Sequence, residues 1–126
     1  MSATPTAQLF RWEGLPTDSP MPLLQRRRVM GEKMMVSEVR LQKGCMVPTH
    51  SHENEQISCV LSGRLKFGLG AEDSPDRREL IVSGGETLLL PSHVPHSAEA
   101  LEDTVVLDLF CPPSATTGID RKPQGH

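Results

Sequence analysis

The histidines of this chain are unevenly placed, and their spacing predicts a metal site. Four of the five lie in two short clusters, His50 with His52 and His93 with His96. Side chains two residues apart on an extended backbone share a face, so His50 and His52 could bind one ion, and Gln56 could join them. A barrel could bring His96 opposite this group. Three imidazoles and one side-chain carbonyl would hold a divalent transition metal (Zn, Ni, Mn or Fe) and leave room for water or substrate.

A single carboxylate, Asp108, interrupts the apolar run Val105–Phe110. The period of a strand places Val106, Asp108 and Phe110 on one face, and the sequence does not decide whether that face points inward. If it does, Asp108 is a candidate general acid/base with a perturbed pKa, and Phe110 is a wall of the pocket. If it does not, Asp108 is an exposed or interface carboxylate.

Three further polar residues are candidate substrate-binding groups. His93 is expected at the rim of a pocket, with a role as fifth metal ligand as the less favoured alternative. Arg40 and Ser58 interrupt apolar strand patterns. Exposed strand faces would explain both of them equally well.

The elements that must position these residues are short strands. No segment has sustained 3.6-residue periodicity, and Pro or Gly interrupts the chain about every ten residues, which is typical of an antiparallel sandwich or barrel. The sequence therefore predicts an all-β fold. The expected strands are Leu23–Met30, Met34–Leu41, Gln56–Leu61, Leu65–Leu69, Glu79–Val82, Glu86–Leu90, His96–Leu101 and Thr104–Phe110.

With 126 residues, the chain has room for one domain with a single core. Residues 1–22 are rich in Pro, Thr and Ser and are expected to form an N-terminal arm, with at most a short strand around Leu9–Trp12. The domain is predicted to span residues 23–113. Residues 114–126 are expected to form a flexible C-terminal tail.

The composition argues against several classes of function. The net charge is −3, and the basic run Arg26–Arg28 is expected to be a solvated stretch of strand, so no nucleic-acid partner is predicted. Aromatic residues make up 3% of the chain and Tyr is absent, which disfavours base stacking and tyrosine chemistry. No leader pattern or long apolar run suggests export or a membrane partner. Three irregularly spaced cysteines are best explained as reduced thiols, so a cytoplasmic protein is expected.

The two histidine clusters resemble the paired motifs of the cupin superfamily. The first motif is Gly, five residues, His-x-His, three or four residues, an acid, six residues, Gly; the second is Gly, five residues, Pro-x-Gly-x-x-His, then Asn. His50, His52 and His96 occupy the histidine positions. The departures are Gln56 at the acid, His93 at the second Gly and Ala100 at the final Asn. This resemblance implies an antiparallel double-stranded β-helix, the cupin or jelly-roll barrel.

Residues 28–113 are similar in particular to small single-domain cupins of the KdgF type. Gln56 in place of the acid and the Leu-Asp-x-Phe-x-Pro-Pro segment at 107–113 carry this resemblance. It implies a metal held by three His and one Gln, with Asp108 and Phe110 beside it, and the ring opening and tautomerisation of 4,5-unsaturated uronates. An Arg suited to a sugar carboxylate follows the Pro pair in that family, and this chain has Ser114 there.

The predicted function is therefore that of a metal-dependent, non-redox enzyme of the isomerase, cyclase or lyase type, acting on a small oxygenated molecule. Opening of unsaturated uronates is the leading reaction. Polyketide cyclisation, hydroxynitrile-lyase-like chemistry and metal-dependent dioxygenation are alternatives, as is a cupin that binds a small molecule without turnover. Pairing of exposed sheets predicts a homodimer.

Overall fold

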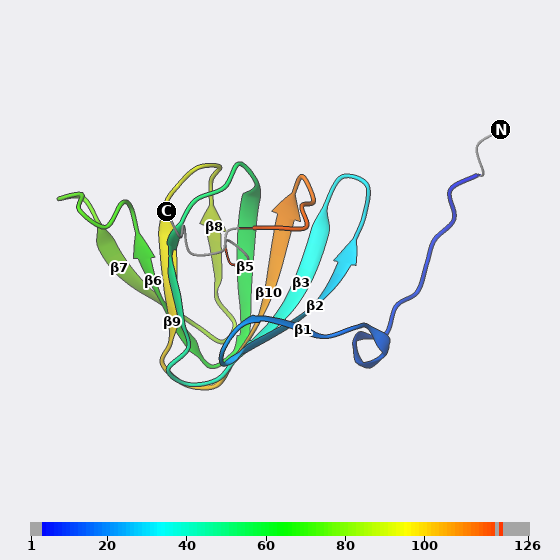
Figure 1. The fold of residues 1–126 in the computed structure, drawn as a ribbon, viewed down its shortest axis with the longest axis horizontal. Helices are drawn as coiled ribbons and strands as arrows, with labels where there is room; N and C mark the ends of the chain where they lie inside the picture. The colour runs from blue at the N-terminus through cyan, green and yellow to red at the C-terminus, as the bar shows by residue number, and fades with distance from the viewer. Residues whose placement is uncertain (1–3, 118, 120–126) are drawn as a thin grey trace.

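Two antiparallel sheets face each other in the computed structural model, which describes residues 4–117 and 119 (Figure 1). One sheet has the order β1-β2-β3-β10-β5-β8, and the other has the order β4-β9-β6-β7. This jelly-roll β-sandwich confirms the predicted all-β fold. The elements are η1 (Trp12–Gly14), β1 (Asp18–Met21), β2 (Leu24–Met30), β3 (Met35–Leu41), β4 (Met46–His50), β5 (Glu55–Ser62), β6 (Arg64–Leu69), β7 (Arg78–Ser83), β8 (Thr87–Leu90), β9 (His96–Ala100) and β10 (Thr104–Cys111).

The core lies between the inner faces of the two sheets. Strand β10 illustrates the pattern, because every second side chain along it, Thr104, Val106, Asp108 and Phe110, is buried. This alternation is what a strand with one face toward a core requires. Asp108 therefore points inward. The apolar part of the core comprises Leu24, Val39, Leu41, Cys45, Val47, Val60, Leu65, Phe67, Val82, Leu90, Ala100 and Val106.

Gly63 is the residue at which the chain passes from one sheet to the other, between β5 and β6. Its φ of +90° lies in the left-handed region. A Cβ at this position would collide with the Asp103 carbonyl oxygen and the Thr104 hydroxyl at the start of β10. Only glycine satisfies both constraints, so this turn fixes how the two sheets meet.

The N-terminal region differs from its prediction in one element. The strand expected around Leu9–Trp12 does not form, and the strand in this region is β1, which pairs with β2. Two arginine side chains of β2 hold η1 and β1 in place. Arg27 donates to the Trp12 carbonyl, and Arg26 makes a two-pronged ion pair with Asp18. The interpretation of Arg26–Arg28 as solvated is thus wrong for Arg26, which is 4% exposed.

Strand β4 was not expected, because Gly44 and Pro48 interrupt its sequence. It forms at the edge of the four-stranded sheet, where it pairs only with β9. An edge strand tolerates proline because one side of its backbone has no strand to bond. This matters for the site, because β4 ends at His50.

The chain termini and the cysteines complete the fold. Most of the expected tail lies outside the described residues, and within its described part Thr117 is buried. Cys45, Cys59 and Cys111 are free thiols, as the sequence predicts. Among the described residues, no helix has the length and apolar character needed to cross a membrane.

Candidate metal centre

Three histidines converge inside one end of the sandwich. His50 is the last residue of β4, and His96 is the first residue of β9 directly opposite it. His52 follows in the loop after β4. The ring centroids are 4.4–5.7 Å apart, and one ring nitrogen of each histidine lies within 4.8 Å of the others.

Backbone carbonyl oxygens orient all three imidazoles. In each ring Nδ1 lies at hydrogen-bond distance from a carbonyl two residues away, so it donates its proton there and leaves a lone pair on Nε2. Metal-binding histidines are held in this way, because the second hydrogen bond fixes both tautomer and ring direction. The acceptors are the carbonyl oxygens of Pro48 (2.8 Å), Val94 (2.9 Å) and Asn54 (3.0 Å).

The buried Nε2 of His96 shows that the group fits a metal ion. This nitrogen has no hydrogen-bond partner among the described residues, which is costly for a polar atom unless a ligand takes it. Burial lowers the pKa of His96 to about 4, so the ring is neutral and able to bind a cation. Gln56 Oε1 lies 3.0 Å from His52 Nε2 and adds an oxygen donor. The predicted set of His50, His52, Gln56 and His96 is therefore brought together.

A buried hydrogen-bonded chain links this cluster to Asp108. Gln56 Nε2 donates to Ser58 Oγ at 2.9 Å, and Ser58 Oγ donates to Asp108 Oδ1 at 2.6 Å. With its amide nitrogen toward Ser58, Gln56 presents its carbonyl oxygen to the histidines. Burial raises the pKa of Asp108 to about 6, against the opposing effect of hydrogen bonds from Ser58 and Gln56. A carboxyl group with such a pKa exchanges a proton readily near neutral pH.

Removal of the Ser58 hydroxyl should destabilise the fold. The Ser58→Ala change leaves the Gln56 amide nitrogen and the Asp108 carboxylate without their shared buried partner, which costs about 1–3 kcal/mol. We expect the free energy of unfolding in urea to fall by that amount. Ser62→Ala on the exposed end of the same strand is the control and should change it by less than about 0.5 kcal/mol. Equal effects of the two variants would contradict the network.

The remaining predicted site residues fall in three different places. Phe110 is buried and its ring stands edge-on to His52 at 5.8 Å, so it forms a wall of the site. His93 is exposed in the loop before β9, with its N–H donating to the His52 carbonyl. Its ring is not part of the converging histidine group. His93 thus lies beside the converging group through its backbone, and a place at the rim of a pocket stays a prediction for its ring.

Arg40 is not where a substrate-binding role requires it. Its side chain is 57% exposed and pairs with Glu38. Val39 and Leu41, its neighbours in β3, point into the core, so alternation sends Arg40 to the outer face of the sheet. Arg40 borders hollows elsewhere on the molecule and is not brought to the histidine cluster.

A small cavity of about 40 Å³ opens beside the histidines. Its walls include side chains from both sheets and, unexpectedly, Thr117 and Ile119 from the segment after β10. Arg28, which the sequence predicts to be solvated, lies on the inner face of β2 but outside the lining of this cavity. The sequence pattern indicates this direction, because Leu24, Arg26 and Arg28 occupy every second position of β2 and Leu24 and Arg26 are buried.

Comparisons with known proteins agree with this architecture. A family model for the cupin domain matches residues 37–111. KdgF from Halomonas sp. has a similar structure, with a TM-score of 0.74 and 30% sequence identity over 87% of this chain and 97% of that chain. An RmlC-like cupin from Shewanella frigidimarina NCIMB 400 gives a TM-score of 0.76 at 20% identity, covering 87% of this chain and 95% of the other. Oxalate decarboxylase from Bacillus subtilis gives 0.78 at 20% identity over 92% of this chain and 32% of its own. A comparison with curated proteins finds no match.

The two likenesses at 20% identity concern the fold alone. The family match carries more, because it runs from Ser37 in β3 to Cys111 at the end of β10 and so contains every residue of the converging site. Sheet order, histidine geometry and matched segment agree. The chain therefore belongs to the cupin family.

Proposed function

We propose that this protein is a metal-dependent enzyme that moves protons on a small oxygenated substrate without redox chemistry. The observation that carries the proposal is the contact of Gln56 with both His52 and the Ser58–Asp108 pair. It joins the candidate metal ligands to a buried acid through two hydrogen bonds. A divalent ion held by His50, His52, His96 and Gln56 would supply Lewis acidity, undiminished by any anionic ligand.

The residues around the ion have separable tasks in this scheme. Asp108 takes a proton from one substrate atom and returns it to another, with a pKa of about 6 that suits both directions. Ser58 orients the carboxyl group through its 2.6 Å hydrogen bond. Phe110 closes the site beside His52 and keeps water from the reacting atoms.

The specific reaction we propose is the opening and tautomerisation of a 4,5-unsaturated uronate to a linear keto acid. It is supported by the KdgF-type pattern of three His, Gln, Asp and Phe, and by the likeness to KdgF from Halomonas sp. at 30% identity. This conversion is a sequence of proton transfers, so Asp108 is well suited to it. A sugar acid needs more room than this cavity of about 40 Å³ offers. Thr117 and Ile119 fill the space next to the cavity, so a bound sugar acid would extend into that space.

The test is to incubate the metal-loaded protein with 4,5-unsaturated galacturonate without oxygen. We expect the ultraviolet absorbance of the ring double bond to decay faster than in the enzyme-free control, with a linear keto acid as the product in NMR spectra. Conversion that requires oxygen would instead indicate a dioxygenase. No acceleration with any of Zn, Ni, Mn or Fe would overturn the uronate assignment.

A further inference from the structure

A row of polar side chains crosses the inner face of the larger sheet at one level. Arg28 of β2 pairs with Ser37 of β3, Ser37 pairs with Asp108 of β10, and Asp108 pairs with Ser58 of β5. Directly paired residues of neighbouring strands point to the same side. The row therefore ends in a guanidinium on one side of Asp108 and in the hydroxyl that orients Asp108 on the other.

The spacing of this row suits a small organic acid. Each step between neighbouring strands is about 4.8 Å, so the Cα atoms of Arg28 and Asp108 are about 10 Å apart. An arginine side chain is long enough to span much of such a gap, and the guanidinium of Arg28 now lies at Ala115 and near Asp18. A molecule with its carboxylate on Arg28 would have carbon atoms several bonds away within reach of Asp108.

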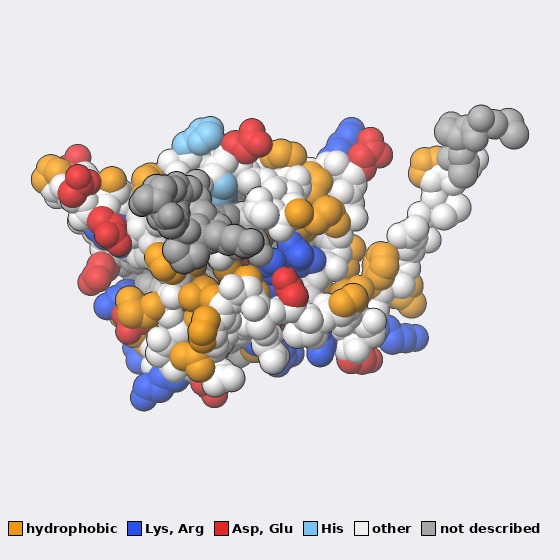
Figure 2. Space-filling model, viewed as in Figure 1, with side chains coloured by type: hydrophobic (Ala, Val, Ile, Leu, Met, Phe, Trp, Pro, Cys, Tyr) orange, Lys and Arg blue, Asp and Glu red, His pale blue; other side chains and the backbone are white. Residues whose placement is uncertain are grey.

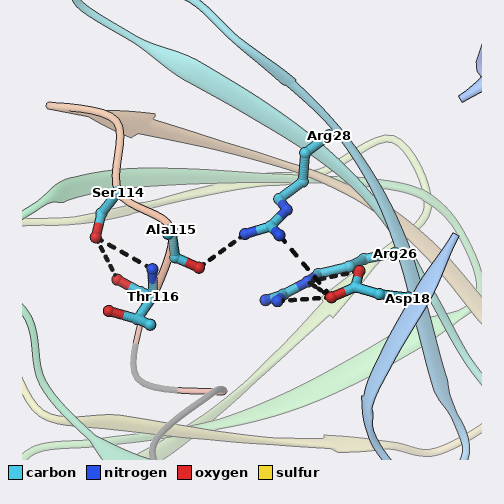
Figure 3. Close-up of polar contacts among 6 residues, drawn as sticks. All are labelled: Asp18, Arg26, Arg28, Ser114, Ala115 and Thr116. Atoms are coloured by element: carbon cyan, nitrogen blue, oxygen red, sulfur yellow. Dashed lines mark hydrogen bonds and ion pairs between the residues drawn. The ribbon is translucent and has the colours of Figure 1, made fainter. Parts of the chain in front are cut away.

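Arg28 has a neutral hydrogen-bond partner and a more distant carboxylate in this structure. Its Nη1 donates to the Ala115 carbonyl at 2.8 Å, and its Nη2 lies 3.9 Å from Asp18 (Figure 3). That carboxylate is already held by Arg26 through Nε and Nη2 at 2.9–3.2 Å. Arg28, 25% exposed, is thus bonded to a neutral oxygen although its fork is shaped for an anion.

The segment after β10 contacts Arg28 and also forms part of the cavity wall. Figure 2 shows a Lys or Arg side chain and an Asp or Glu side chain side by side at the surface of one face, with a His side chain visible on the same face. The segment that supplies the Ala115 carbonyl also supplies Thr117 to the cavity wall. Ala115 and Thr117 are two residues apart, so a ligand that takes the place of the Ala115 carbonyl on Arg28 would lie beside a residue of the cavity wall.

We propose that Arg28 is the residue that binds the carboxylate of the substrate, taking up the role for which Ser114 is unsuited. This inference rests on the proposed function and identifies the group that selects an acid as its substrate. The carboxylate takes the place of the Ala115 carbonyl, and a charge-assisted, two-pronged hydrogen bond replaces a neutral one.

Other described arginines are less suited to this role. Arg77 binds the Gly70 carbonyl and Ser97 Oγ in the smaller sheet. Arg26 is buried against Asp18, and Arg40 points outward. Arg28 alone among these combines an inward direction, a level shared with Asp108 and a neutral principal partner.

The test compares binding of D-galacturonate with that of neutral D-galactose by NMR titration of the metal-loaded protein. Arg28→Gln should weaken galacturonate binding about 10- to 100-fold, the loss expected for one charge-assisted contact, and change galactose binding less than about twofold. Arg28→Lys keeps the positive charge but not the forked guanidinium, so its affinity for galacturonate should lie between those of the wild type and Arg28→Gln. Arg40→Gln removes a charge from the outer face of the next strand and should match the wild type.

Three results would overturn the proposal: galacturonate binding unchanged in Arg28→Gln, equal weakening of both sugars, or no binding of galacturonate by the wild type. Equal weakening would mean that Arg28 only anchors the segment at Ala115. The outcome is separable from that of the proposed reaction. If the protein binds galacturonate through Arg28 but does not open unsaturated galacturonate, the role of Arg28 stands and the proposed reaction fails. If it opens unsaturated galacturonate rapidly and Arg28→Gln binds galacturonate as the wild type does, the reaction stands and the role of Arg28 fails.

Discussion

Replacing His96 with alanine is expected to lower the metal content of the purified protein from about one ion per chain to less than about a tenth of that. His96 is the most buried of the three histidines, and its Nε2 has no other described partner. The change removes a donor from a set of four. Because each remaining donor is neutral, no ligand charge compensates for the loss.

The measurement is elemental analysis of protein purified with and without added Zn, Ni, Mn and Fe, with circular dichroism as the check of folding. His93→Ala is the matched control, because His93 lies in the loop just before β9, three residues from His96, but outside the converging group. It should retain the wild-type metal content. A folded His96→Ala protein with a full complement of metal would contradict the assigned ligand set.

The fold follows from local pattern to a large extent. Turn residues and alternation located most strands, since a two-residue period with one buried face is readable without knowledge of partners. The exceptions were β1 and β4, whose stability comes from tertiary contacts. Asp18 is held by the Arg26 side chain eight residues away, and β4 pairs within the smaller sheet with β9, a strand distant from it in the sequence.

The residues of the candidate site could be predicted to different degrees, because some are placed by local spacing and others only by tertiary contacts. The spacing of His50 and His52 is a local property, whereas the meeting with His96 required the motif resemblance and the barrel it implies. Alternation alone does not decide whether Asp108 or Leu107 points inward. The run has apolar residues on both faces of the strand, so either face could be the one that packs against the core. The same ambiguity leaves Arg40 open to a pocket role or an exposed strand face, and the structure places it on the outer face.

The two sheets contribute different chemistry to one site. The imidazoles of the candidate metal centre come from β4, the loop after it and β9, which belong to the smaller sheet or adjoin it. Asp108 and Ser58 come from the larger sheet. Gln56 belongs to the larger sheet and contacts both groups, so its amide fixes the position of the acid relative to the histidines.

Asp108→Asn is expected to reduce kcat for uronate opening about 10²- to 10⁴-fold, the range for loss of a general acid/base. Asparagine has nearly the same shape and can still accept the Ser58 hydrogen bond, so the fold and the metal site should persist. Metal content should therefore equal that of the wild type, and KM should change far less than kcat, since the loss concerns proton transfer rather than binding.

The comparison that makes this result interpretable is Asp73→Asn, which removes a carboxylate from the exposed loop between β6 and β7. It should leave kcat unchanged, whereas Asp108→Asn should not. If Asp108→Asn retained kcat within twofold of the wild type while binding a full complement of metal, proton transfer would have to be assigned to another group. The chain linking Gln56, Ser58 and Asp108 would then serve only to hold Gln56 in place, and the Ser58→Ala loss of stability would be its sole consequence.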